Sequence, residues 1–201
     1  MVQDEEVIVA DMLRQRLERA AEALTAYVQE THTFTQAVGL VKACFERGGK
    51  LILCGNGGSA AFCSHAVDDF FVDVFGDHPM PVIALVDNTP TVTAVANDFG
   101  YERIFSQQLK ALGNAGDVLI AVSTSGNSPN VLRAVEVAKA REMTVIGMTN
   151  SVGGRLRELA DVWLRSTSPD GQVTEEMQLP LMHALTKCVA KLMFPGEPET
   201  P

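Results

Sequence analysis

Two short loops rich in glycine and serine, the glycine loop (residues 54–59) and the serine loop (residues 123–128), carry the residue types that bind a phosphate group. The first reads Cys-Gly-Asn-Gly-Gly-Ser and the second Ser-Thr-Ser-Gly-Asn-Ser. Each follows an apolar run typical of a strand and precedes a stretch with helical spacing, so its N–H groups and hydroxyls would face an anion at a helix N-terminus. One such loop alone is typical of a turn with a helix cap. Two in one chain predict a phosphorylated ligand bound from both sides.

His65 and Asp69 form a second set of residues suited to chemistry. They stand four residues apart in the helical stretch after the glycine loop, so they share one face of a helix. Asp68 lies about 100° around the helix from Asp69 and is the weaker candidate. Imidazole and carboxylate groups move protons or bind divalent cations. A histidine beside an apolar face is also common as a hydrogen-bonded structural residue, and neighbouring aspartates are common as a solvated pair.

Five short apolar runs predict the strands of one parallel sheet. They are apolar throughout, as strands are when helices cover both faces of a sheet. Helical stretches alternate with them, which is typical of a three-layer α-β-α sandwich, and ligands of such folds bind beyond the carboxyl ends of the strands. Both loops lie there. The predicted strands are 51–54, 82–86, 118–123, 144–148 and 162–164, and the helices among and after them are 60–75, 91–97, 103–112, 129–141, 154–160 and 176–193.

Two further helices are predicted ahead of the first strand, over residues 5–30 and 33–47. Apolar residues recur every three or four positions in the first of them and form one stripe that needs a cover. We therefore expect residues 1–49 to be N-terminal helices that pack in an oligomer. Residues 50–195 would form the α/β domain and residues 196–201 a tail, within one structural domain.

Composition and charge exclude some classes of function. The 201 residues carry a net charge of −9 with no basic stripe, which argues against binding to duplex nucleic acid. No apolar run approaches the ~20 residues that span a membrane, and the acidic N-terminus does not have the pattern of a signal peptide. The four cysteines include no CxxC pair and are typical of thiols in a reducing compartment. We expect a cytoplasmic protein.

The chain also resembles a known family. The glycine loop, Ala-Asn-Asp-Phe-Gly at residues 96–100 and the serine loop, in this order, are similar to segments of the sugar isomerase (SIS) domain, and more narrowly of its phosphoheptose isomerase branch. The likeness covers nearly the whole chain. It implies the SIS fold, with a central five-stranded parallel sheet, and isomerisation of the phosphorylated ketose sedoheptulose 7-phosphate to an aldose heptose 7-phosphate through an enediolate. The substrate- and phosphate-binding residues that it implies are Asn56, Gly57, Ser59, Asp98, Ser123, Thr124, Ser125 and Ser128, the last four through hydroxyls that bind the phosphate.

The resemblance implies a metal and acid–base site as well. In this branch a histidine matching His65 and a glutamate four residues later are metal ligands, and the glutamate is the proposed base; here that position is Asp69, whose carboxylate reaches about 1.5 Å less far. His183 matches a histidine that is a ligand and acid/base partner. Eight residues earlier, Glu175 replaces the glutamine of an Arg-Ile-Gln-Glu segment. We expect zinc at His65, Asp69, Glu175 and His183, with Asp69, Glu175 and His183 catalytic. Pro180 is expected to kink the last helix and to shift Glu175 relative to His183.

Two other functions remain open. The same branch includes tetrameric, non-catalytic proteins that associate with a replication initiator and lack the carboxylate matching Asp69 and the histidine matching His183. Both residue types are present in this chain, which favours an enzyme. The third possibility is a regulatory module that senses a sugar phosphate. The family also implies a homotetramer with active sites shared between subunits.

Overall fold

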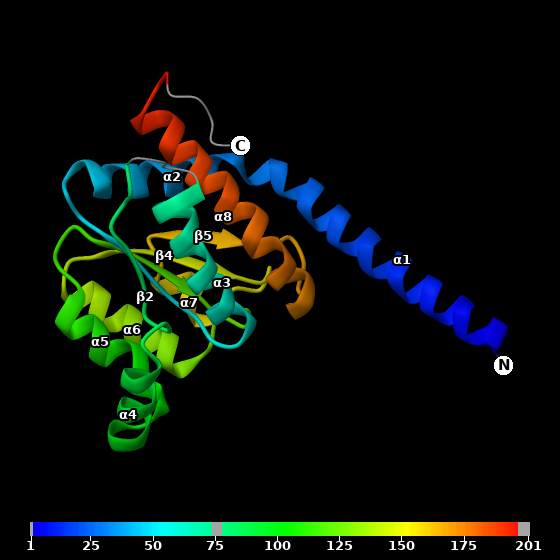
Figure 1. The fold of residues 1–201 in the computed structure, drawn as a ribbon, viewed down its shortest axis with the longest axis horizontal. Helices are drawn as coiled ribbons and strands as arrows, with labels where there is room; N and C mark the ends of the chain where they lie inside the picture. The colour runs from blue at the N-terminus through cyan, green and yellow to red at the C-terminus, as the bar shows by residue number, and fades with distance from the viewer. Residues whose placement is uncertain (1, 74–77, 197–201) are drawn as a thin grey trace.

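The middle layer of the protein is a parallel sheet of five strands, as the sequence predicts. The structure is a computed structural model that describes residues 2–73 and 78–196 (Figure 1). Each pair of neighbouring strands is parallel, and the order across the sheet is β2-β1-β3-β4-β5. The strands are β1 (Leu51–Cys54), β2 (Val82–Ala84), β3 (Val118–Val122), β4 (Thr144–Thr149) and β5 (Val162–Arg165).

Helices cover both faces of this sheet, so successive residues along a strand enter two different cores. In β1, Leu51 and Leu53 pack with the helices of one face, whereas Ile52 and Cys54 pack with those of the other. This double burial explains why β1 and β3 are apolar throughout, and the predicted three-layer sandwich is confirmed. The first face carries α2 (Thr31–Glu46), α3 (Gly58–Asp68) and α8 (Gly171–Met193), and the second carries α4 (Thr89–Phe99), α5 (Ile104–Leu112), α6 (Pro129–Ala140) and α7 (Gly154–Leu159).

The first helix, α1 (Val2–Ala26), projects away from the sandwich in Figure 1. Its C-terminal end and the short 3-10 helix η1 (Tyr27–Glu30) pack on α8 through Ala23 and Tyr27. The next helix, α2, differs because its buried face belongs to the core beside the sheet. The apolar stripe of α1 lies farther out, and its side chains are between 57% and 68% exposed; they are Val7, Ile8, Val9, Met12, Leu13 and Leu17.

The structure departs from the predicted helices at two places near the site. The last helix begins at Gly171 rather than at residue 176, because the Asp170 side chain caps it by accepting hydrogen bonds from the N–H groups of Gln172 and Val173. The helix predicted over 60–75 changes at Asp69 into a short π-helix, η2 (Asp69–Asp73). Residues 74 and 75 of that prediction, and residues 197–201 of the predicted tail, lie outside the described residues.

Candidate active site

Both predicted loops lie at the point where the order of strands in the sheet reverses. From β1 the chain adds β2 on one side, and the later strands β3, β4 and β5 all add on the other side. The glycine loop follows β1 and the serine loop follows β3, the two neighbours that flank this switch point. In open parallel sheets the ligand crevice lies beyond the carboxyl ends of the strands at such a point. The topology therefore places the two loops side by side at the carboxyl ends of β1 and β3.

The serine loop gathers hydroxyl groups at the N-terminus of α6. Ser123 and Ser128 place their Oγ atoms 2.9 Å apart, and Ser128 is the residue that precedes the helix. Ser125 is exposed and Thr124 is half-buried, at the side of the loop facing the start of α8. Hydroxyls and backbone N–H groups at a helix N-terminus attract an anion. The four hydroxyl residues predicted to bind phosphate thus belong to one short turn.

Close contact with the β4–α7 connection holds the serine loop in place. Gly126 has a φ of +67°, and a Cβ added there would stand 1.8 Å from the carbonyl oxygen of Gly153. A Cβ at Gly154 would stand 2.4 Å from the carbonyl oxygen of Ser125. The Gly126 carbonyl accepts a hydrogen bond from the N–H of Leu156 at 2.9 Å. Glycine is therefore required by both the backbone conformation and the lack of space.

The glycine loop is held by side chains from distant parts of the chain. Gly57, at a φ of +55°, leads into α3, and Asn56 exchanges two hydrogen bonds with Asn130 of α6, at 2.9 and 2.7 Å. Ser59 is buried, with its Oγ 3.3 Å from the side chain of Gln178 in α8. Sequence reasoning missed Asn130 and Gln178. A polar residue in the first turn of α6 was the one available signal for Asn130; nothing pointed to Gln178.

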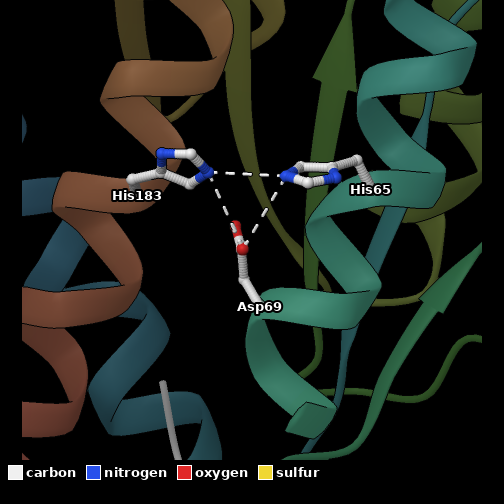
Figure 2. Close-up of side chains that lie close together, drawn as sticks. All are labelled: His65, Asp69 and His183. Atoms are coloured by element: carbon white, nitrogen blue, oxygen red, sulfur yellow. Dashed lines mark hydrogen bonds and ion pairs between the residues drawn. The ribbon is translucent and has the colours of Figure 1, made fainter. Parts of the chain in front are cut away.

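His65, Asp69 and His183 come together between α3 and α8, as Figure 2 shows. The Nε2 atoms of the two histidines lie 3.4 Å apart, and Asp69 Oδ1 is 3.9 Å from His65 Nε2 and 3.8 Å from His183 Nε2. Asp69 is 2% exposed, while both histidine side chains are 45% exposed. Asp68 is exposed on another side of the helix. The cluster thus has a buried carboxylate beneath two imidazoles that a ligand can reach.

Glu175 lies in the neighbouring pocket, outside the three-residue cluster. It is exposed on α8 and packs against Gly58, where an added Cβ would meet Glu175 Oε2 at 2.7 Å. The pocket has a volume of about 580 Å³, and its lining includes Glu175, His65, Gln178 and Arg16. Among the described residues, the group whose ligand atoms all lie within 4.8 Å of one another is His65, Asp69 and His183. α8 continues through Pro180 as a single helix.

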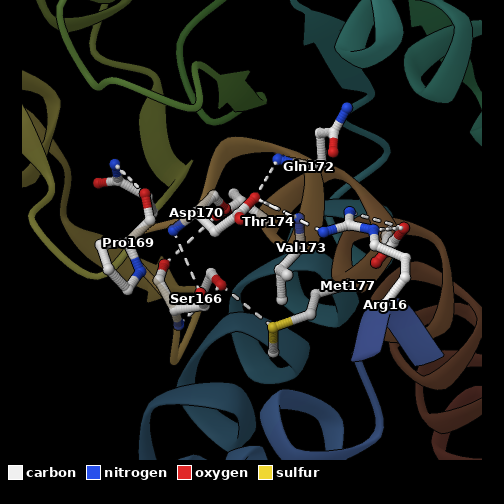
Figure 3. A network of polar contacts seen from close by, with 11 residues as sticks. Arg16, Ser166, Pro169, Asp170, Gln172, Val173, Thr174 and Met177 are labelled. Carbon is white, nitrogen blue, oxygen red and sulfur yellow. Dashed lines mark hydrogen bonds and ion pairs between the residues drawn. The ribbon is translucent and has the colours of Figure 1, made fainter. Parts of the chain in front are cut away.

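Side chains of α1 and of the cap fix the first turns of α8, as Figure 3 shows. Arg16 donates to Glu176 Oε1 from Nε at 3.0 Å and from a terminal nitrogen at 2.7 Å. Its other terminal nitrogen lies 3.7 Å from Asp170. The hydrogen bond from the Val173 N–H is the main cause of the lowered pKa of Asp170, followed in the same direction by that from Gln172. These contacts position the part of α8 that carries Glu175.

Asp98, predicted to contact the substrate, is exposed near the end of α4, where its carboxylate accepts a hydrogen bond from Asn97 at 2.8 Å. Two thiols near the site are buried, Cys54 at the first position of the glycine loop and Cys63 in α3. Burial raises the pKa of Cys54 to about 12 and that of Cys63 well above its usual range. Such thiols stay protonated near neutral pH and are poor nucleophiles. The reactive groups of the site are therefore its imidazoles and carboxylates.

The fold and site define an α/β protein that combines two loops rich in glycine and serine at its switch point with a His–Asp–His cluster. The sequence profile of the SIS domain family matches residues 15–150. The chain therefore belongs to the SIS domain family. None of the described helices is long and apolar enough to cross a membrane.

Similar proteins place the chain within a branch of that family. It is 46% identical to the phosphoheptose isomerase of Burkholderia pseudomallei (strain 1710b) over 153 residues, which are 76% of this chain and 78% of the relative. It is 39% identical to that of Rhodospirillum rubrum over 176 residues, or 87% and 94% of the two chains. A solved phosphoheptose isomerase from Neisseria gonorrhoeae matches with a TM-score of 0.81 and 35% identity, covering 94% of this chain and 98% of its own. One from Francisella tularensis gives 0.83 and 33%, covering 90% and 97%. The predicted phosphoheptose isomerase branch is confirmed.

Proposed function

We propose that this protein isomerises sedoheptulose 7-phosphate to an aldose heptose 7-phosphate. The observation that carries the proposal is the arrangement beyond the neighbouring strands β1 and β3. A hydroxyl-rich turn follows β3, and the helix after the glycine loop carries the histidine–carboxylate cluster toward α8. The relatives named phosphoheptose isomerase support the choice of substrate. The reaction moves a proton from C1 of the ketose to C2, through an enediolate in which the C2 oxygen becomes negative.

The serine loop would bind the phosphate end of the sugar. Its hydroxyls and the N-terminus of α6 supply donors and a favourable dipole without any cationic side chain. This arrangement suits a chain of net charge −9. Asn56, Gly57 and Ser59 of the glycine loop would then face the sugar chain, and Asp98 is proposed to contact the substrate as in the family.

Proton transfer requires a base at C1 and an acid at the sugar oxygen. Asp69 is the proposed base, because it is a buried carboxylate held beside two imidazoles. His183 is the proposed acid, and its half-exposed ring allows contact with a ligand. Glu175 is the alternative base, on the pocket wall next to His65.

We further infer that the cluster holds a divalent metal ion, with zinc the best fit. Two imidazole nitrogens and a carboxylate oxygen are preferred zinc ligands, and their atoms in His65, Asp69 and His183 all lie within 4.8 Å of one another. Glu175 is the proposed fourth ligand. A bound metal ion would polarise the carbonyl and hydroxyl oxygens of the sugar. The residues themselves would orient the sugar and move its protons.

We also propose a cytoplasmic homo-oligomer, a tetramer with shared active sites. The exposed apolar stripe of α1 supports an interface there, because contiguous apolar surface of this kind is usually covered by a partner. Analytical ultracentrifugation of the full chain tests the number of subunits.

The central experiment incubates the purified protein with sedoheptulose 7-phosphate, with and without added zinc, and follows formation of an aldose phosphate. We expect turnover that depends on the metal and is lost in His183→Ala. Conversion of other ketose phosphates, but not of sedoheptulose 7-phosphate, would support isomerase activity and reject sedoheptulose 7-phosphate as the substrate. Absence of turnover with every ketose phosphate, while His183→Ala binds sugar phosphate as wild type does, would reject catalysis and favour a sensing protein. Metal analysis of the protein as purified tests the metal site separately.

A further inference from the structure

Asn56 of the glycine loop lies at the centre of a hydrogen-bond network that joins three elements. Asn56 Nδ2 donates to Asn130 Oδ1 at 2.9 Å, and Asn130 Nδ2 donates to Asn56 Oδ1 at 2.7 Å. The hydroxyl of Tyr101, in the 3-10 helix η3 (Tyr101–Arg103), donates to the same Asn56 Oδ1 at 2.9 Å. Asn130 is 2% exposed in the first turn of α6. The network therefore ties the glycine loop to the helix whose N-terminus follows the serine loop.

A backbone group fixes the direction of these hydrogen bonds. The Val131 N–H donates to Asn130 Oδ1 at 3.0 Å, and because a backbone N–H cannot accept, the Asn130 atom that faces it must be oxygen. The NH₂ group of Asn130 is then the atom that donates to Asn56 Oδ1. This chain of donors and acceptors removes the usual ambiguity between the two ends of an asparagine amide. The orientation of Asn56 follows from that of Asn130.

The network leaves Asn56 with one hydrogen-bonding capacity for a ligand. Asn130 and Tyr101 occupy both lone pairs of Asn56 Oδ1, and Asn130 takes one of its two N–H groups. The second N–H has no partner among the residues that the structure describes. Asn56 is half-buried, and its residue is partly open to solvent at the carboxyl end of β1.

We propose that Asn130 and Tyr101 are positioning residues that restrict Asn56 to one role, that of hydrogen-bond donor to an oxygen of the bound sugar chain. The inference rests on the proposed function in taking a sugar phosphate as the ligand. It assigns the two ends of that ligand to different groups of residues. Asn130 governs binding of the sugar chain through Asn56, whereas the serine loop binds the phosphate through its own hydroxyls. Loss of Asn130 therefore lowers the preference for a sugar phosphate over inorganic phosphate.

Calorimetric titration with sedoheptulose 7-phosphate and with inorganic phosphate tests this preference. Asn130→Asp places a second acceptor against Asn56 Oδ1, and we expect the ratio of the two affinities to fall about 10- to 100-fold at pH 8. The ratio cancels the effect of the added charge on the phosphate, which both ligands carry. At lower pH the protonated carboxyl group can donate again, so the ratio should return toward that of wild type. A merely structural defect would not recover with pH.

Two further variants complete the test. Tyr101→Phe removes one donor to Asn56 Oδ1 at a residue that is 57% exposed, and should lower the ratio about 3- to 10-fold at every pH. Gln36→Glu makes the matching amide-to-acid change at an exposed position of α2 and should leave the ratio unchanged.

A wild-type ratio for Asn130→Asp at pH 8, or a lowered ratio that does not recover with pH, overturns the proposal. If Asn130→Asp does not fold, the test rests on Tyr101→Phe. A wild-type ratio of the two affinities in that variant overturns the proposal. The quantity read is an affinity, which is obtained whether or not the bound sugar phosphate is isomerised. A wild-type protein that binds the sugar phosphate but does not isomerise it therefore counts against the proposed function and leaves this test intact.

Discussion

The two ends of the proposed site, the serine loop and the His–Asp–His cluster, are built in different ways. The serine loop consists of short side chains on a backbone turn that close glycine contacts hold against the β4–α7 connection. The His–Asp–His cluster consists of longer side chains from two helices, with both histidines 45% exposed. The proposed anion binding therefore depends on backbone shape, and the proposed chemistry depends on how α3 and α8 are placed. Substitutions at the two ends should fail in different ways, one through folding and the other through turnover.

Removal of the acid at the cluster should give the largest effect. His183→Ala is expected to lower kcat by about 10²- to 10⁴-fold, the usual range for loss of a general acid or base. Affinity for inorganic phosphate should stay at the wild-type value, because the serine loop is untouched. Steady-state kinetics and calorimetry measure the two quantities. His32→Ala, at an exposed histidine of α2, is the matched control and should retain full activity. A parallel loss of phosphate affinity in His183→Ala would show that the two ends are not independent.

Adding a side chain to the serine loop should lower the stability of the fold rather than the rate of turnover. Gly126→Ala forces a Cβ to within 1.8 Å of the Gly153 carbonyl oxygen at a residue with φ of +67°. We expect a loss of about 2–4 kcal/mol in the free energy of unfolding, measured by urea denaturation. Gly39→Ala is the control, since no atom lies within 4 Å of its added Cβ in α2. That change should stabilise the protein by about 0.5–1 kcal/mol. Equal stability of the two variants would contradict the proposed locking of the loop.

Glu175→Gln separates the two candidate bases and should have a smaller effect on rate. If Asp69 is the base, Glu175→Gln removes no general base, and kcat should fall by less than about tenfold. Loss of a general base itself lowers kcat by about 10²- to 10⁴-fold. Asp69→Asn should show that larger loss. The reverse ranking of the two variants in steady-state kinetics would transfer the role of base to Glu175.

The smallest effect is expected at the cap of α8, far from both ends. Asp170 has a lowered pKa in the folded protein, so its contribution to stability is present above its unfolded pKa of 3.8 and is lost as pH falls through the folded value. Asp170→Ala should therefore lower the urea midpoint at pH 7, and the difference from wild type should narrow as the pH falls below about 4, because the protonated carboxyl group is a weaker acceptor for the cap. Asp170→Asn keeps an acceptor for the cap, so its urea midpoint at pH 7 should lie between those of wild type and Asp170→Ala. A difference that persists unchanged at low pH would contradict the assignment.

Much of the fold could be predicted because β1, β2 and β3 are apolar along their whole length and β4 is apolar between two threonines. The sequence also distinguished Asp69 from Asp68, since helical spacing alone places Asp69 on the same face as His65. The start of α8 was missed, although Asp170 ahead of a helical stretch is a recognisable N-cap.

Other parts of the site depend on contacts between distant residues. Asn56 and Asn130 are 74 residues apart, and Ser59 and Gln178 are 119 residues apart, so no local pattern indicates either pair. Glu175 shows the same limit. Its spacing from His183 was known, but its position against Gly58 depends on how α8 packs beside the glycine loop.

The contact between the serine loop and the β4–α7 connection has a consequence for protein engineering. Because Gly126 and Gly153 leave no room for a side chain between them, the two turns are complementary surfaces and not independent modules. A designer who transplants residues 123–128 onto another parallel sheet would need to transfer residues 150–156 with them. The smallest transferable unit of the proposed phosphate site is a pair of adjacent turns.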